Sequence, residues 1–406
     1  MAKVVLHIGE PKTGTTFLQQ VMWSNRAELA AHGVVLPGHH PQDHFRASQD
    51  LRGLEKRADD PAGSWTGEWE IMAQQAKQAP GVAVISHELF SAADAGQASR
   101  AVESLLPAEV HVVLTVRDMA TLLPAEWQET IKHRNARHWE DWLADVIDRE
   151  SAAADRRQYW FWRVHDTLEI LRIWSADLPA DRVHVITVPP RGSGSGLLWD
   201  RFASLLGVDP AVADTTRARP NASLGLPEIE FLRRLNQKLP DEVPGWFYMW
   251  NVKEVVAHQA FATRPAGARL VLPGSREPWA KEQAETLIAG LRGGGYGIIG
   301  DLDELRPRQG GPYSSPGNQP AERVLDAAVD ATAALVAHQY RRSLRGKRHG
   351  GKARRAGVAG RLESAVADMP GVKRAVRELS SRYPAVRHLR IAVWRLLERR
   401  RAASRD

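Results

Sequence analysis

The segment from His7 to Thr16, with the sequence HIGEPKTGTT, constrains the fold more than any other stretch of this chain. It follows a short apolar run at 2–6 that is typical of a buried strand. The apolar stretch at 17–22 that comes after it is typical of the first turns of a helix. A glycine-bounded loop between strand and helix gathers backbone N–H groups and the positive end of the helix dipole. The sequence therefore predicts an anion-binding loop within an α/β fold.

Apolar runs and amphipathic patterns alternate along the rest of the chain. Because continuous apolar strands separated by helices are typical of parallel sheets covered on both faces, we expect a P-loop-like three-layer sandwich. The predicted strands are 33–37, 82–86, 110–116 and 183–188. The predicted helices include 139–147, 164–176, 228–239, 252–263, 277–291 and 322–340.

Composition divides the chain into three parts. Residues 1–305 form the predicted α/β domain, and the Gly- and Pro-rich stretch at 306–320 is a predicted linker. Residues 321–406 are predicted to be a helical, basic, partly disordered extension. Within it, the basic run at 341–355 is expected to be disordered, and an amphipathic helix is expected from Pro384.

The charge of the chain is distributed unevenly. Residues 341–406 carry 20 Lys and Arg and 5 Asp and Glu, whereas the first 340 residues carry 35 basic and 43 acidic side chains. The mildly acidic body argues against nucleic acid as a partner. The absence of cysteine excludes disulfides and thiolate chemistry. No apolar stretch approaches the roughly 20 residues of a membrane-spanning helix, so a cytoplasmic location is expected.

The spacing within the first loop distinguishes two kinds of phosphate site. Gly9 and Gly14 have the separation found in nucleoside triphosphatase loops, where Lys and then Ser or Thr follow the second glycine. Here Thr15 occupies the position of that lysine, and Lys12 lies two residues before Gly14. A nucleotide kinase or other triphosphatase remains an alternative, although Thr15 contradicts its pattern.

The form Pro11-Lys12-Thr13-Gly14-Thr15-Thr16 resembles the 5′-phosphosulfate loop of sulfotransferases that use 3′-phosphoadenosine-5′-phosphosulfate (PAPS), particularly bacterial, carbohydrate-sulfotransferase-like members. The resemblance implies that Lys12 holds the bridging oxygen and 5′-phosphate of the donor. It also implies that the loop's threonine hydroxyls and backbone amides bind phosphate oxygens. The donor-binding residues expected from this loop are Pro11, Lys12, Thr13, Gly14, Thr15 and Thr16.

The donor's 3′-phosphate requires a second anion site. In the family an Arg ends a central strand, and a Ser follows about eight residues later. Here Arg117 ends the run at 110–116, but position 125 is Ala. With the helix expected to begin near Pro124, Gln128 is the replacement donor we predict, with Thr130 and Thr121 as alternatives. Arg191, in a Gly-rich loop after the strand at 183–188, is predicted to add positive charge.

Sulfuryl transfer to a hydroxyl needs a cation for the leaving group and a base for the acceptor. Lys12 is the predicted cation, and no metal is expected. In the family the base is His in some branches and Glu in others, and here His87 and Glu88 follow the strand at 82–86 together. The pattern Ser86-x-Glu88 favours Glu88, while His87 has an ordinary pKa closer to neutrality.

Other histidines have simpler interpretations. His7 is expected to be a buried, hydrogen-bonded histidine at the end of the first strand. His39, His40 and His44, with Asp43, have a spacing that matches no known zinc site, so a polar loop is predicted there.

The acceptor is predicted to be a hydroxyl of a carbohydrate, glycolipid or small molecule. The aromatic group at 246–250 has two interpretations, a platform for a sugar or lipid and an ordinary part of the core. The basic tail also has several: an anchor at the inner face of the membrane, a solvated extension, or a partner-binding helix. A third class of function stays open, a non-catalytic anion- or membrane-binding protein with a degenerate sulfotransferase domain.

Overall fold

The computed structural model describes residues 2–54, 65–148, 156–194, 196–218, 223–265, 267–308 and 310–353. Contacts between residues group the chain into a first unit, Met1–Ala334, and a second, Leu335–Asp406. All the strands that the described residues form, and all the predicted site residues, belong to the first unit.

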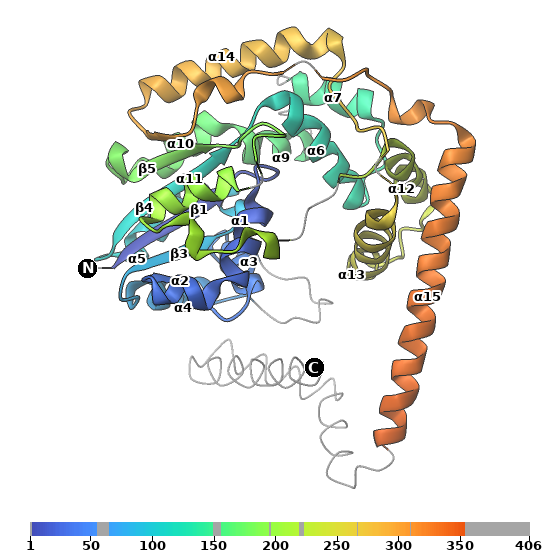
Figure 1. Cartoon of the computed structure of the whole chain (residues 1–406), viewed down its shortest axis with the longest axis horizontal. Coiled ribbons are helices and arrows are strands. Elements are labelled where there is room, and N and C mark those ends of the chain that lie inside the picture. Colours follow the sequence, from blue (N-terminus) through green and yellow to red (C-terminus); the bar gives the residue numbers. More distant parts are fainter. Residues whose placement is uncertain are drawn as a thin grey trace. The chain divides into compact units, whose positions relative to one another are not determined.

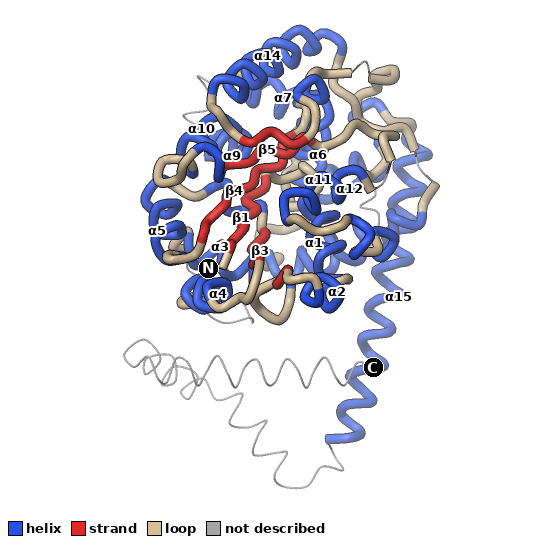
Figure 2. The backbone as a smooth tube through the Cα atoms, turned by 60° about the vertical axis from the view of Figure 1, so that its left-hand side comes forward, coloured by secondary structure: helices blue, strands red, loops and turns tan. Residues whose placement is uncertain are grey.

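A six-stranded parallel sheet forms the centre of the first unit (Figures 1 and 2). Its order is β2-β3-β1-β4-β5-β6, and every neighbouring pair runs parallel. The strands are β1 (Lys3–Gly9), β2 (Val34–Val35), β3 (Val82–Ser86), β4 (Glu109–Val116), β5 (Val183–Thr187) and β6 (Gly297–Ile299). Because β1 lies between β3 and β4, the loops that follow these three strands meet at one edge of the sheet, where open α/β sheets bind ligands.

Helices cover both faces of this sheet, so the predicted three-layer fold class is confirmed. In β1, Val4, Leu6 and Ile8 pack into one core with residues of α4 (Glu68–Lys77), α5 (Ala95–Leu105), α10 (Thr167–Trp174) and α14 (Glu277–Gly293). Val5 points to the opposite core, which α1 (Thr15–Ser24) and α11 (Leu197–Leu206) complete. A strand whose successive side chains are all buried must be apolar at those positions, which explains the apolar run Val4-Val5-Leu6 after the half-buried Lys3.

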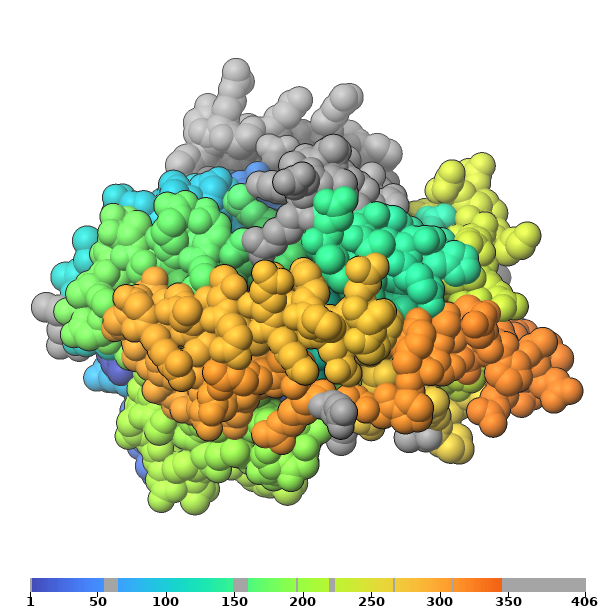
Figure 3. Space-filling model, turned by 90° about the horizontal axis from the view of Figure 1, so that it is seen from above, coloured from blue at the N-terminus to red at the C-terminus, as the bar shows by residue number. Residues whose placement is uncertain are grey.

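The helices of the N-terminal half are α1 (Thr15–Ser24), α2 (Arg26–Ala31), α3 (Pro41–Leu51), α4 (Glu68–Lys77), η1 (Glu88–Ala92), α5 (Ala95–Leu105), α6 (Met119–Lys132), α7 (Trp139–Ile147), α9 (Arg156–His165) and α10 (Thr167–Trp174). Those of the C-terminal half are α11 (Leu197–Leu206), α12 (Leu226–Lys238), α13 (Gly245–Tyr248), the π-helix η5 (Met249–Ala260), α14 (Glu277–Gly293) and α15 (Ala321–Ala353). Short 3-10 turns are η2 (Ala180–Arg182), η3 (Pro210–Val212), η4 (Thr215–Arg217), η6 (Phe261–Thr263), η7 (Gly274–Arg276), η8 (Leu302–Leu305) and η9 (Pro316–Asn318). Figure 3 shows α14, drawn in gold, on the face of the first unit that is seen from above.

Three local predictions differ from the structure. The helix expected at 164–176 is two helices, because the Asp166 side chain accepts a hydrogen bond from the Glu169 N–H and so caps the start of α10. The strand expected at 33–37 is only the two residues of β2. The helix expected at 252–263 begins earlier and is the π-helix η5, followed by η6.

The disorder expected at 341–355 stays a prediction, although α15 continues through this basic run as far as Ala353. Arg and Lys are good helix formers, and extending an established helix costs far less than starting one. The helix predicted from Pro384 lies outside the described residues, and the division of the chain at 305 and 320 stays a prediction. In the described part of the chain, no helix is both long and apolar enough to cross a membrane.

Candidate active site

The loop between β1 and α1 depends on backbone conformations that most residues avoid. Gly9 has a φ of 103°, and a Cβ added there would lie 2.7 Å from the Cα of Glu88. Gly14 has a φ of 85° and a similar conflict with Leu198, at 2.4 Å. Lys12 also adopts a positive φ, 62°, which is uncommon for a residue with a side chain. Such strain is found where the surrounding structure fixes a functional conformation.

Thr13 braces this loop from inside. Its hydroxyl donates to the Glu10 carbonyl at 2.5 Å and lies 2.6 Å from the Thr115 hydroxyl on β4. The Glu10 N–H donates to the Thr115 carbonyl at 3.1 Å. Thr13 is fully buried, so its hydroxyl stabilises the loop in this structure rather than facing a ligand.

Helix α1 begins directly after the loop, at Thr15. Gly14 is its N-cap, no side chain caps it, and no acidic residue lies in its first turn. The first N–H groups of a helix lack partners within the helix, and the dipole favours an anion beside them. Thr15 is buried and Thr16 is exposed at this point. The uncapped helix N-terminus expected after this loop is therefore present, while anion binding and the roles of the individual threonines stay predictions.

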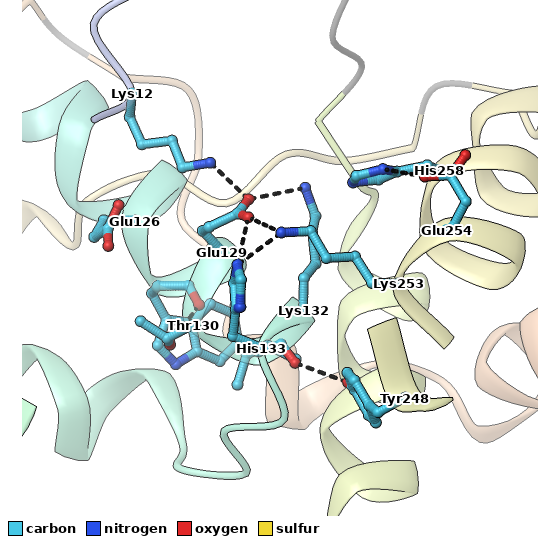
Figure 4. Close-up of polar contacts among 12 residues, drawn as sticks. Lys12, Glu126, Glu129, Thr130, Lys132, His133, Tyr248, Lys253, Glu254 and His258 are labelled. Atoms are coloured by element: carbon cyan, nitrogen blue, oxygen red, sulfur yellow. Dashed lines mark hydrogen bonds and ion pairs between the residues drawn. The ribbon is translucent and has the colours of Figure 1, made fainter. Parts of the chain in front are cut away.

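Lys12 reaches from the loop to α6 (Figure 4). Its Nζ lies 2.6 Å from Oε2 of Glu129, and its side chain is 24% exposed. Burial disfavours the charged ammonium, but the carboxylates of Glu129 and Glu126 outweigh burial and raise the pKa of Lys12. Lys12 is thus held charged at the mouth of the loop.

Glu129 is the centre of a larger charged cluster, drawn in Figure 4. Lys253 of η5 places Nζ 2.6 Å from Oε1 of Glu129, and His133 places Nε2 3.1 Å from the same oxygen. Lys132 Nζ lies 3.7 Å from Oε2. Burial raises the pKa of Glu129, but His133 and the lysines outweigh it and hold this pKa far below its ordinary value.

Arg117 follows β4 and lies beside the loop between β1 and α1. Its NH1 donates to the Lys12 carbonyl at 3.3 Å. Burial lowers the pKa of Arg117, and the charge of Arg191 contributes to this shift. Burial likewise lowers the pKa of Arg191, with a contribution from Arg269. These arginines therefore gather positive charge around Asp118, although the binding roles of Arg117 and Arg191 stay predictions.

The helix after Arg117 begins earlier than expected. Asp118 is the N-cap of α6, and its side chain accepts from the Thr121 N–H at 2.9 Å. Pro124 therefore lies inside the helix rather than in its first turn, which shifts the helical faces assumed for the residues that follow. Thr130 donates to the Trp127 carbonyl, and Gln128 is buried. In the described part of the chain, no hydrogen bond joins Gln128 to Lys12 or Arg117, and its donor role stays a prediction.

The structure separates the two candidate bases. His87 caps η1, and its Nδ1 accepts from the Leu89 N–H at 3.1 Å. Burial lowers the pKa of His87. Glu88 lies against Gly9 and accepts from Gln19 Nε2 at 3.2 Å. Burial raises the pKa of Glu88, but His87, the Gln19 hydrogen bond and Lys12 together lower it, so Glu88 is an ionised carboxylate next to the loop.

A buried, charged histidine contacts the loop through Glu10. His165 is fully buried, with Nδ1 3.4 Å from Oε2 of Glu10 and Nε2 3.6 Å from Oε2 of Glu126. Thr167 donates to the other oxygen of Glu10 at 2.5 Å. Burial opposes the imidazolium, but the two carboxylates outweigh it and raise the pKa of His165 to about 9. The sequence contained no signal for this contact, because its members come from three distant segments.

The remaining histidines have structural partners. His7 is buried, 2.8 Å from the Ser86 hydroxyl and 3.3 Å from that of Thr115, which confirms its predicted role. The imidazole of His44 contacts the carbonyls of Pro37 and Ser86. His40 and Asp43 form a capping box at the start of α3. Among the described residues, no group of three or more His, Asp or Glu could hold a metal ion.

Two pockets lie in the first unit, and one of them adjoins a predicted site residue. A pocket of about 100 Å³ adjoins Arg117 and is lined by His165 and Thr167 among others. A pocket of about 630 Å³ lies elsewhere, between Thr263 and the first turns of α15, and includes none of the predicted site residues.

Comparison with known proteins yields one match. No family model matches this sequence, and neither does any curated protein. Among solved structures, a sulfotransferase from Alicyclobacillus acidocaldarius matches 57% of this chain and 91% of its own, at 15% identity and a TM-score of 0.35. A superposition this loose establishes neither the family nor the activity. The function must therefore be inferred from the residues of the site.

Proposed function

We propose that this chain is a sulfotransferase that moves the sulfuryl group of PAPS to a hydroxyl of a carbohydrate or glycolipid acceptor. One observation carries the proposal. In the loop from Gly9 to Gly14, Lys12 combines a strained backbone with an ammonium group that is held charged beside Glu129. Glu88, the first residue of η1 after β3, packs its Cα and Cβ against Gly9 and has an ionised carboxylate. A cation and a base thus flank one anion-binding turn.

This arrangement suits an in-line displacement at sulfur. The acceptor oxygen attacks the sulfur and forms a new S–O bond, and the bond from sulfur to the 5′-phosphate oxygen breaks. Lys12 neutralises the charge that develops on the leaving 3′,5′-diphosphoadenosine. Glu88 accepts the proton of the acceptor hydroxyl. We assign this role to Glu88 rather than His87, because the Nδ1 of His87 is used by the η1 cap and burial disfavours its protonated form.

Exposed aromatic side chains favour a carbohydrate or lipid acceptor. Of the aromatic group at 246–250, Tyr248 is buried, whereas Trp246, Phe247 and Trp250 are 41%, 38% and 64% exposed. They belong to α13 and the start of η5, the helix that also carries Lys253. Aromatic rings at a surface offer an apolar face to sugar rings and acyl chains.

The direct test follows radioactive sulfur from ³⁵S-labelled PAPS to a panel of glycosides and glycolipids. We expect labelled product from the wild-type protein and a loss of rate of about 100-fold or more in Lys12→Ala, since the charge on the leaving group is then uncompensated. Lys281→Ala, at an exposed lysine of α14, is the matched control and should retain the wild-type rate. Equal rates for Lys12→Ala and wild type would refute the assignment of Lys12.

A further inference from the structure

Arg52, at the end of α3, has a positive charge that no carboxylate of the described residues offsets. It is the C-cap of that helix, and its guanidinium carbon lies 5.2 Å from the ring centre of Trp160 on α9. Within the described residues, its guanidinium group forms no hydrogen bond and no ion pair. Burial and the charge of Arg163 lower the pKa of Arg52 to about 10, and no acidic group of the described residues acts in the opposite direction. A partly buried guanidinium without a counter-charge is costly, and a bound anion would reduce that cost.

Two acidic side chains close to these arginines are bound to other groups. Asp50 precedes Arg52 by two residues, and its carboxylate accepts from two backbone N–H groups at the start of α4, at 3.0 and 2.9 Å. The carboxylate of Glu169 lies near Arg163 but receives two hydrogen bonds of 2.7 Å from Arg172. The positive charge of Arg52 therefore remains available to a ligand.

A second arginine, Arg163, lies beside Arg52 and is joined to the segment that carries the proposed base. Arg163 follows Trp160 by three residues on α9, so the two side chains share one face of that helix. Its Nε donates to the carbonyl of Ala92 at 3.0 Å, and Ala92 is the last residue of η1. Because η1 begins at Glu88, two guanidinium groups and an indole ring border the segment of the proposed base.

The position of Arg52 separates it from the donor loop and places it near the base. Phe45, also on α3, packs against His87 with 5.4 Å between the ring centres. Burial lowers the pKa of His87, and the nearby charge of Arg52 contributes to this shift. Lys12 of the donor loop is instead bound to Glu129 at 2.6 Å, and among the described residues no hydrogen bond or ion pair joins either of them to Arg52. An anion at Arg52 would therefore belong to the acceptor rather than to the donor.

We propose that Arg52 and Arg163 bind a carboxylate of the acceptor beside the ring of Trp160, so that the acceptor is a sugar acid. A guanidinium group presents a planar fork of N–H donors that matches the two oxygens of a carboxylate. Trp160 is 37% exposed, and its ring offers an apolar surface to the sugar. The carboxylate anchors the acceptor beside η1, where Glu88 can accept the proton of a hydroxyl group. This inference rests on the proposed sulfotransferase function.

The test is calorimetric titration of the full chain with 4-nitrophenyl β-D-glucuronide and 4-nitrophenyl β-D-glucoside, each with and without saturating 3′,5′-diphosphoadenosine. The two probes differ only in the carboxylate of the first and the hydroxymethyl group of the second. We expect the glucuronide to bind at least about tenfold more tightly than the glucoside. Arg52→Gln and Arg163→Gln should each weaken the glucuronide by about tenfold and leave the glucoside and the nucleotide unchanged, because each removes a charge-assisted hydrogen bond. Arg276→Gln, at an exposed arginine before α14, is the matched control and should keep every wild-type affinity.

The outcomes separate this inference from the proposed function. Failure of the wild-type protein to bind 3′,5′-diphosphoadenosine contradicts the sulfotransferase itself, while the titrations without nucleotide still test the two arginines. Normal binding of the nucleotide with no binding of the glucuronide, or with equal affinity for the two probes, overturns the acceptor site alone. So does a glucuronide affinity that is unchanged in Arg52→Gln and Arg163→Gln. An equal loss of affinity for the nucleotide in these variants would assign the arginines to the donor, which also overturns the acceptor site.

Discussion

The buried imidazolium of His165 predicts a specific dependence of stability on pH. In the folded chain the pKa of His165 is about 9, against an ordinary value of 6.5. A group whose pKa is raised on folding stabilises the folded state fully below its unfolded pKa and loses that contribution as pH rises through the folded value. The contribution of His165 should therefore be complete below about pH 6.5 and almost absent above about pH 9.

The size of this effect follows from the two pKa values. Each pKa unit corresponds to about 1.4 kcal/mol, so the charged state of His165 contributes about 3 kcal/mol to the free energy of unfolding at low pH. The full value applies because His165 is shielded from solvent between Glu10 and Glu126. In His165→Gln this contribution is lost, and the difference from wild type should shrink by about 3 kcal/mol between pH 6 and pH 9.

The assay is urea unfolding followed by tryptophan fluorescence at pH 6, 7.5 and 9. His32→Gln, at an exposed histidine, is the control for removing an imidazole elsewhere. A difference between wild type and His165→Gln that is constant across this range, or that grows with pH, would refute the buried ion pair.

Three further predictions concern the site itself. Glu88→Gln should lower kcat by about 100-fold or more with unchanged nucleotide affinity, and His87→Ala should retain most turnover; rate assays giving the reverse order would move the base to His87. Glu129→Gln should tighten binding of 3′,5′-diphosphoadenosine by about fivefold, because Lys12 no longer has to leave its partner; weaker binding in calorimetry would contradict this. Gly9→Ala should cost about 1–3 kcal/mol of stability in urea unfolding, given its positive φ and the approach to Glu88; wild-type stability would argue against the loop geometry.

The central sheet could be predicted from the sequence because its strands are buried on both faces. A run such as Val110–Val116 is apolar at nearly every position, and this signal survives without knowledge of its neighbours. β6, with only three residues, is too short to give such a signal and was not predicted. The break between α9 and α10 was missed because a single aspartate, Asp166, determines it.

The site was predictable only where its residues are adjacent in the chain. The loop at 9–14 combines its chemistry in one short motif, and Arg117 directly follows the apolar run at 110–116. Glu129 was missed although it lies between Gln128 and Thr130, which were considered as donors. Its partners Lys12 and Lys253 are more than a hundred residues away, and only the folded chain brings them together.

The measurement that tests the account most directly is calorimetric titration of the purified wild-type protein with 3′,5′-diphosphoadenosine, without magnesium, alongside ATP with magnesium. The account predicts tight binding of 3′,5′-diphosphoadenosine alone, because the loop places Lys12 before Gly14 and Thr15 where a triphosphatase has its lysine. Binding of ATP alone would contradict the sulfotransferase and favour a nucleotide kinase. Binding of neither would indicate a non-catalytic protein with a degenerate domain.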